Sequence, residues 1–126
     1  MFSKKLIARL GLLATTTAFA CSAIAASEFP TGTYTASDVR LNFDAQGRFR
    51  ASIGDATMVE GSYTATHDTL TLTDASGPWA CLKNPKERTG SYHWKLDRDH
   101  LTLTKLDDPC KDRGETLTPK PWEKES

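Results

Sequence analysis

The chain has 126 residues, of which 38% are hydrophobic and 25% charged, with 16 basic and 16 acidic side chains. This composition is typical of one soluble globular domain, and it argues against extended disorder or several domains. The balanced charge also removes the main argument for a nucleic-acid partner, because binding to phosphates requires an excess of lysine and arginine.

The first 25 residues predict a secretory signal peptide. Three basic residues precede an apolar run over residues 10–20, and small residues follow at Ala23-Ile24-Ala25. The run is too short to span a bilayer. We therefore expect residues 26–126 to form a single periplasmic or secreted domain, with 13 basic residues against 16 acidic ones and a net charge of about −3.

The signal region has a second interpretation. Residues Ala18-Phe19-Ala20-Cys21 can be read as a lipobox, in which Cys21 would be acylated and would anchor the protein to a membrane. Lipoboxes usually carry Leu at the first of these positions and a small residue at the second, whereas Ala23-Ile24-Ala25 fits ordinary signal peptidase cleavage. We expect Cys21 to be removed, with membrane attachment as the alternative.

A repeat organises the rest of the chain. The three tyrosines occur in the tripeptides Gly32-Thr33-Tyr34, Gly61-Ser62-Tyr63 and Gly90-Ser91-Tyr92, whose glycines are 29 residues apart both times. Leu-Thr-Leu-Thr follows the second tripeptide at residues 70–73 and the third at residues 101–104. A period this regular indicates one supersecondary unit used three times.

Each unit predicts β-strands, because apolar and polar residues alternate with a period of two and short polar turns separate the runs. About eight such strands form an antiparallel up-and-down meander, and closing it into a barrel buries one face and leaves no open edge. A two-sheet sandwich is the alternative. No segment after the signal peptide shows helical periodicity over more than a turn. The residues expected to point inward include Tyr34, Leu41, Phe43, Phe49, Ala51, Val59, Tyr63, Leu70, Leu72, Tyr92, Trp94, Leu101 and Leu103.

The chain resembles the lipocalin and calycin barrels, in which a G-x-W or G-x-Y signature opens the first strand. Gly32-Thr33-Tyr34 matches this signature, and Asp108-Pro109-Cys110-Lys111-Asp112-Arg113 matches the D-x-C-x-x-R ending of small secreted bacterial lipocalin-like proteins. The resemblance implies a barrel with a ligand cavity. It also implies that Arg113 packs across an aromatic ring, Tyr34 or Trp94, at one end of the barrel, whereas the alternative is a solvated arginine.

Two cysteines remain after the signal peptide. Cys81 and Cys110 each lie 20 residues beyond the glycine of their repeat unit, so they occupy equivalent places in successive units. In an exported domain such a pair most simply forms one disulfide. A metal site or a catalytic thiol is the alternative, although no C-x-x-C spacing supports it.

The polar residues give no sign of a catalytic or metal site. His67, His93 and His100 lie in turns or on outward positions, which is typical of surface histidines. Asp107 and Asp108 are adjacent, so on a strand they would face opposite ways, and a capping or salt-bridge role fits them better than paired acid–base chemistry. No nucleophile motif is present. We expect a protein that is not an enzyme and needs no metal or cofactor.

The function expected from these features is binding of a small, largely apolar molecule inside the barrel. Tyr34, Tyr63, Tyr92 and Trp94 would line the site, with Arg113 at its end. A barrel of eight strands is just wide enough to hold one ligand or to be filled by its own side chains. The alternatives are a periplasmic inhibitor or immunity protein, which would bind a protein partner through the loop at residues 82–89, and a structural envelope component.

Overall fold

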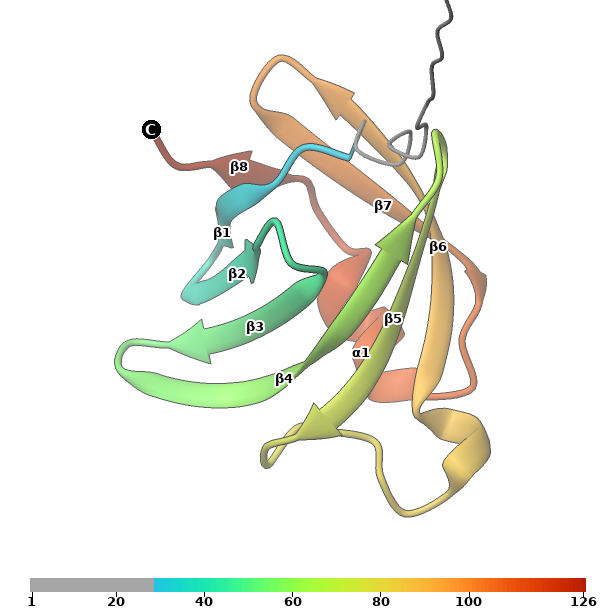
Figure 1. Cartoon of the computed structure of the whole chain (residues 1–126). Helices are drawn as coiled ribbons and strands as arrows, with labels where there is room; N and C mark the ends of the chain where they lie inside the picture. Colours follow the sequence, from blue (N-terminus) through green and yellow to red (C-terminus); the bar gives the residue numbers. More distant parts are fainter. Residues whose placement is uncertain (1–28) are drawn as a thin grey trace, which may run out of the picture.

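The computed structural model describes residues 29–126; the expected signal peptide and Cys21 lie outside the described residues. Within this range eight antiparallel strands close into a barrel, each pairing with its neighbours in chain order and the last pairing with the first (Figure 1). The predicted barrel is confirmed, and the sandwich alternative is wrong. The elements are β1 (Gly32–Ala36), β2 (Val39–Phe43), β3 (Arg48–Ile53), β4 (Ala56–Ala65), β5 (Thr69–Ser76), η2 (Pro85–Glu87), β6 (Thr89–Asp97), β7 (His100–Asp107), α1 (Lys111–Leu117) and β8 (Trp122–Lys124).

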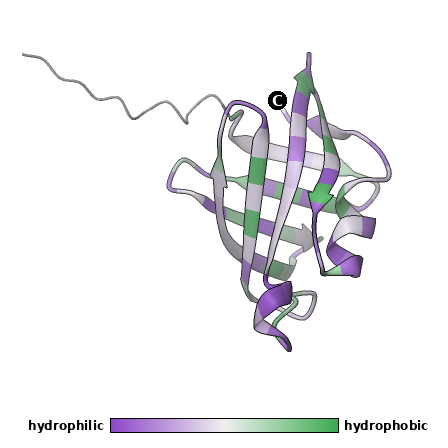
Figure 2. Ribbon diagram, turned by 90° about the vertical axis from the view of Figure 1, so that its right-hand side faces the viewer, coloured by the Kyte–Doolittle hydropathy of each residue, from purple (hydrophilic) through white to green (hydrophobic). Residues whose placement is uncertain are grey.

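The alternation of side chains along the strands builds the core. Because successive residues of a strand face opposite sides, every second residue of each run enters the barrel, and apolar residues recur at intervals along the ribbons in Figure 2. The predicted inward face is confirmed by the buried residues Tyr34, Leu41, Phe43, Phe49, Ala51, Val59, Leu70, Leu72, Tyr92, Leu101 and Leu103. Tyr63 and Trp94, also predicted inward, are half-buried and pack against this core. The buried hydrophobic residues that were not predicted inward are Phe29, Cys110, Leu117 and Trp122.

The three Gly-x-Tyr tripeptides each lie on the first strand of a hairpin, formed by β1–β2, β4–β5 and β6–β7. Strand β3 follows the first hairpin and, because neighbouring strands are antiparallel, it reverses the direction of the hairpins after it. The second and third units therefore point the same way, whereas the first points the opposite way. In consequence β5 and β7 end at the same end of the barrel, which we call the α1 end.

Helix α1 is a difference from the sequence prediction, which placed no helix after the signal peptide. Among its seven residues Gly114 and Leu117 are buried, and the polar side chain of Arg113 is buried as well. It therefore lacks the apolar stripe by which an amphipathic helix is recognised. The helix lies beside the strands of the barrel (Figure 2). The Trp122 Nε1–H donates to the Leu117 carbonyl at 3.0 Å and holds the end of the helix at the α1 end. No helix of the described chain has the length and apolar character needed to cross a bilayer.

The opposite end of the barrel is packed with aromatic rings. Phe29, Phe43, Tyr63 and Trp94 form a cluster with ring centroids 4.9 to 5.5 Å apart. These distances are typical of favourable edge-to-face and tilted pairs. The Trp94 Nε1–H donates to the Thr66 carbonyl at 3.0 Å, which fixes the ring to the β4–β5 turn. We call this the aromatic end.

Candidate functional site

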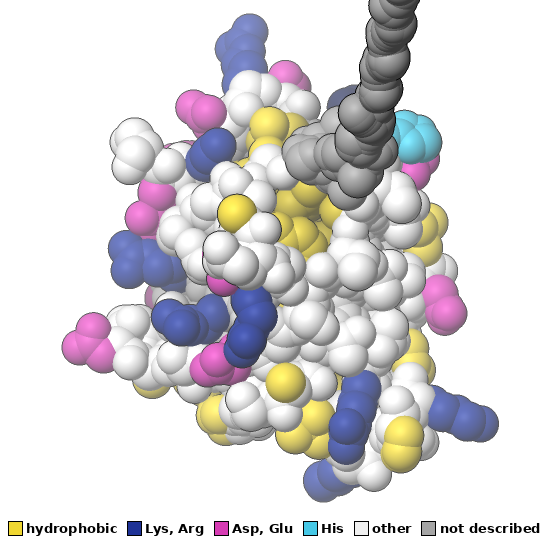
Figure 3. Space-filling model, viewed as in Figure 1, with side chains coloured by type: hydrophobic (Ala, Val, Ile, Leu, Met, Phe, Trp, Pro, Cys, Tyr) yellow, Lys and Arg dark blue, Asp and Glu magenta, His cyan; other side chains and the backbone are white. Residues whose placement is uncertain are grey.

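A cavity of about 620 Å³ lies at the α1 end, between the inward side chains of β2 to β5, the β5–β6 connection and α1. This volume falls within the range of small-molecule sites, roughly 300–1,000 Å³. Its lining is mostly apolar, and hydrophobic side chains reach the surface along the lower edge of Figure 3, near this connection. The apolar lining residues are Leu41, Phe49, Ala51, Val59, Leu72, Pro78, Trp79, Ala80, Leu82 and Leu117.

The β5–β6 connection, residues 77–88, forms one wall of the cavity. It begins where Gly77, with a φ of +115°, turns the chain away from the sheet in a conformation that glycine adopts readily. The Trp79 N–H donates to the Met58 carbonyl at 2.8 Å, and the Asp74 N–H donates to the Arg88 carbonyl at 2.9 Å. Both ends of the connection are thus attached to the barrel, and Trp79 remains 37% exposed at the rim.

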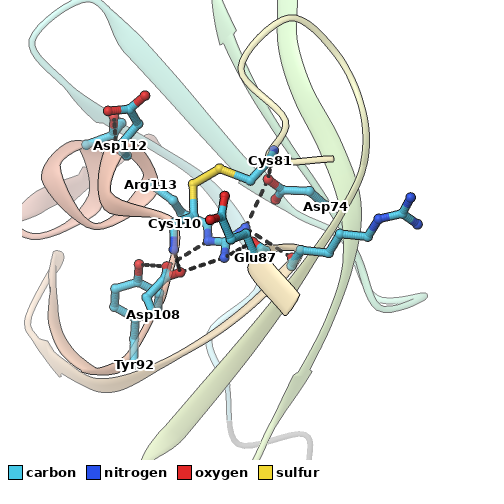
Figure 4. The surroundings of a disulfide bond; sticks show 10 residues. Asp74, Cys81, Glu87, Tyr92, Asp108, Cys110, Asp112 and Arg113 are labelled. Carbon is cyan, nitrogen blue, oxygen red and sulfur yellow. Dashed lines mark hydrogen bonds and ion pairs between the residues drawn. A yellow bond between two sulfur atoms is a disulfide. The ribbon is translucent and has the colours of Figure 1, made fainter. Parts of the chain in front are cut away.

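Arg113 joins this connection to the barrel and to α1. Its guanidinium forms ion pairs with Asp74 at 2.9 Å and Asp108 at 2.6 Å (Figure 4). It also donates to the carbonyls of Glu87 and Arg88, at 2.8 and 3.0 Å. The side chains of Arg113, Asp74 and Asp108 are only 7%, 2% and 0% exposed. A buried guanidinium with this many acceptors holds the β5–β6 connection, the barrel and α1 together. Breaking one of its ion pairs would be unfavourable, because it would leave an unpaired charge inside the protein.

Asp108 occupies the centre of the network. Burial alone would raise its pKa, but hydrogen bonds from Arg113, the Tyr92 hydroxyl and the Cys110 N–H outweigh burial and hold the pKa of Asp108 below its usual value. A Cβ at Gly90 would overlap the Asp108 carboxyl group, so the third repeated glycine makes room for it. Of the capping or salt-bridge role predicted for Asp108, the salt bridge is confirmed by its pair with Arg113. The N-cap residue of α1 is Cys110, and no side-chain cap hydrogen bond forms there.

The disulfide predicted between Cys81 and Cys110 is confirmed, with 6.3 Å between the two Cα atoms. Cys81 follows β5 and Cys110 follows β7, so the parallel directions of these two strands bring both cysteines to the α1 end. The Cys81 N–H donates to Asp74 Oδ2 at 2.8 Å, which places the disulfide directly beside the ion network (Figure 4). The bond ties one wall of the cavity to the start of α1.

Arg113 lines the cavity, but its surroundings differ from those implied by the family resemblance. Within residues 29–126 its guanidinium binds two carboxylates and two carbonyls, and no stack on Tyr34 or Trp94 occurs. The reason is electrostatic, since two buried carboxylates attract the cation more strongly than the face of a ring does. The alternative of a solvated arginine is wrong as well, because the side chain is buried.

The four aromatic residues expected to line a ligand site lie outside the cavity lining. The Tyr34 hydroxyl donates to the Pro30 carbonyl and the Tyr63 hydroxyl to the Asp44 carbonyl, both at 2.6 Å, while the Tyr92 hydroxyl donates to Asp108. Trp94 belongs to the aromatic end. The four side chains pack within or against the core of the barrel. The three tyrosine hydroxyl groups already donate hydrogen bonds within the protein.

All three tyrosines of the chain should therefore resist ionisation. Burial raises the pKa of Tyr34 from 10.0 to about 12. Burial also raises the pKa of Tyr63, with a contribution from Asp44, and that of Tyr92, with a contribution from its hydrogen bond to Asp108. A raised pKa means that the protonated tyrosine favours the fold. This stabilisation is complete below pH 10 and is lost as the pH rises toward 12.

We expect tyrosinate absorbance of the native protein to lag behind that of the guanidinium-unfolded chain, which should titrate near pH 10. The native signal should rise together with the loss of circular dichroism. Ionisation of all three tyrosines near pH 10 in a protein that is still folded would contradict the described burial.

The histidines lie on the surface, as expected. His67 lies 3.8 Å from Asp68, and His100 lies 3.7 Å from Glu123. His93 is exposed on β6. In the part of the chain that the structure describes, no group of three or more His, Cys, Asp or Glu residues converges in a way that could hold a metal ion.

Comparison with known proteins gives no assignment for this site. No protein-family model matches the chain, and neither a curated protein nor a solved structure matches it.

Proposed function

We propose that the protein is an exported, lipocalin-like barrel that binds a small, largely apolar molecule in the cavity at the α1 end. The observation that supports this most strongly is the cavity of about 620 Å³, whose floor consists of inward aliphatic and aromatic side chains of β2 to β5. Each apolar group moved from water into such a site gains about 25 cal/mol per Å² of buried surface.

The rim of the cavity supports binding because it is already held in place. The disulfide ties the β5–β6 connection to α1, and Arg113 binds the backbone of the same connection at Glu87 and Arg88. Binding to a fixed wall avoids most of the entropic cost of ordering a loop. A molecule entering this cavity would therefore keep more of the free energy gained from burial.

The proposed function is ligand binding, and no catalytic role is proposed for the buried carboxylates beside the cavity. Both buried carboxylates at this end, Asp74 and Asp108, are held by the same guanidinium. General acid–base chemistry needs a group that can exchange a proton with a substrate, and an ion pair opposes this. Export is proposed because the disulfide suits an oxidising compartment, periplasmic or extracellular, and because a signal peptide is expected at residues 1–25.

Filling the cavity should abolish binding without unfolding the protein. We expect octanol to bind saturably to the native protein, as measured by calorimetry. Ala80 lines the cavity and is only half-buried, so Ala80→Phe should place a ring in the ligand space and weaken octanol binding about tenfold or more. The matched control is Ala75→Phe, because Ala75 is exposed near the end of β5 and outside the lining.

Equal octanol affinity in both variants would show that the bound molecule lies elsewhere. Absence of saturable binding to the native protein would overturn the proposed function itself. Native mass spectrometry of the protein purified from its own compartment would then identify the natural molecule, since a ligand held in such a cavity should co-purify.

A further inference from the structure

The cavity is lined by more acidic than basic side chains. Arg113 is the buried cation of the lining. Its positive charge also pairs with Asp108, which lies outside the lining. Little of this charge is therefore left to balance the acidic side chains of the lining. The lining thus has an acidic excess beside an apolar floor. Its charged residues are Asp74, Glu87, Asp112 and Glu115 on the acidic side and Lys83 and Arg113 on the basic side. Lys111, outside the lining, lies 3.9 Å from Glu115 in an exposed pair.

Asp74 adds a more specific feature. Its Oδ2 accepts hydrogen bonds from the Cys81 N–H and pairs with Arg113, whereas its buried Oδ1 has no hydrogen-bond partner within residues 29–126. The side chain is 2% exposed, and the residue lines the cavity. A buried carboxylate oxygen without a donor is unfavourable. Because Asp74 borders the cavity, a bound molecule that brings a donor to this edge would remove the deficit.

We propose that the ligand of this cavity is an amphiphilic primary amine, whose ammonium group donates to Asp74 Oδ1 while its alkyl part packs on the apolar floor. The inference rests on the proposed function and makes it more specific. An ammonium supplies the missing donor and is attracted by the acidic excess of the lining. A carboxylate headgroup is rejected by the same charges, and an uncharged alcohol gains only the burial of its chain and a weaker hydrogen bond.

Three probes with the same alkyl chain separate these contributions. Octylammonium, octanol and octanoate are titrated into the native protein, with affinities measured by calorimetry and the site located by amide chemical shifts. We expect octylammonium to bind about tenfold more tightly than octanol, because a hydrogen bond to a charged group is stronger than a neutral one. Octanoate should bind more weakly than octanol.

Two variants test the role of Asp74. Asp74→Asn keeps the shape and an oxygen for Arg113 but removes the charge, so the preference for octylammonium over octanol should disappear while octanol still binds. Asp97→Asn is the control, since Asp97 is an exposed carboxylate at the β6–β7 turn, outside the cavity lining, and its loss should leave the preference unchanged. If Asp74→Asn does not fold, Glu87→Gln with Glu115→Gln should lower the preference by reducing the acidic excess.

The outcomes distinguish the two proposals. Equal binding of octylammonium and octanol at the cavity, or tighter binding of octanoate, would overturn the amine assignment and leave the apolar site in place. A preference for octylammonium that survives in Asp74→Asn would overturn it too, as would an undiminished preference in the double glutamate variant where the first does not fold. No binding of any of the three probes would overturn the proposed function and the amine assignment together.

Discussion

Replacing Arg113 with methionine should lower the free energy of unfolding by about 3–5 kcal/mol, as expected when one partner of a buried ion pair is removed. Methionine retains much of the side-chain volume, but it leaves Asp74 and Asp108 buried without a cation. Urea unfolding followed by circular dichroism measures the loss. Arg50→Met is the matched control, because Arg50 is exposed on β3 and should change stability by no more than about 0.5 kcal/mol.

The same variant should change the acid dependence of stability. Since the fold lowers the pKa of Asp108, its ionised form stabilises the protein above the unfolded pKa of about 3.9, and this contribution is lost as the pH falls through the folded value. Without Arg113 the loss on acidification should be smaller than in the native protein. Equal stability of Arg113→Met and Arg50→Met at neutral pH would contradict the role given to the ion network.

Removing the disulfide is the second large change. The cysteines are 29 residues apart in sequence, so their bond restricts the unfolded chain by about 3.5 kcal/mol in the chain-entropy treatment. The double variant Cys81→Ser with Cys110→Ser should lose about this much stability in urea unfolding. The native protein treated with a reductant serves as the control and should unfold at the same midpoint as the variant.

Loss of the disulfide should also weaken octanol binding, because the β5–β6 connection would have to be ordered by the ligand. An unchanged unfolding midpoint after reduction would contradict the stabilising role of the bond. Unchanged octanol affinity in the reduced protein would show that the rim of the cavity is fixed by Arg113 alone.

The fold could be predicted from the sequence because a period of two determines which face a side chain occupies. Leu41, Leu70 and Leu101 are buried for this reason, with polar neighbours on the other face. The disulfide could be predicted for a related reason. Equivalent positions in two repeat units lie after β5 and β7, whose common direction brings Cys81 and Cys110 to one end of the barrel.

The position of the cavity could not be predicted, because alternation gives the face of a residue but not which part of the interior is filled. Trp94 and Leu72 were both expected inside the barrel, yet Trp94 packs at the aromatic end and Leu72 borders the cavity. Helix α1 escaped prediction because few of its residues are buried. The role of Arg113 depends on Asp74, which is 39 residues away in sequence and reaches it only through the fold.

A map of amide chemical shifts during titration with octanol tests the central claim most directly, because the two ends of the barrel contain different residues. Binding in the cavity should shift the amides of Ala51, Val59, Leu72 and Ala80 and leave those of Tyr63 and Trp94 unchanged. Shifts concentrated on Tyr63 and Trp94, or no saturable shifts anywhere, would contradict a ligand site at the α1 end.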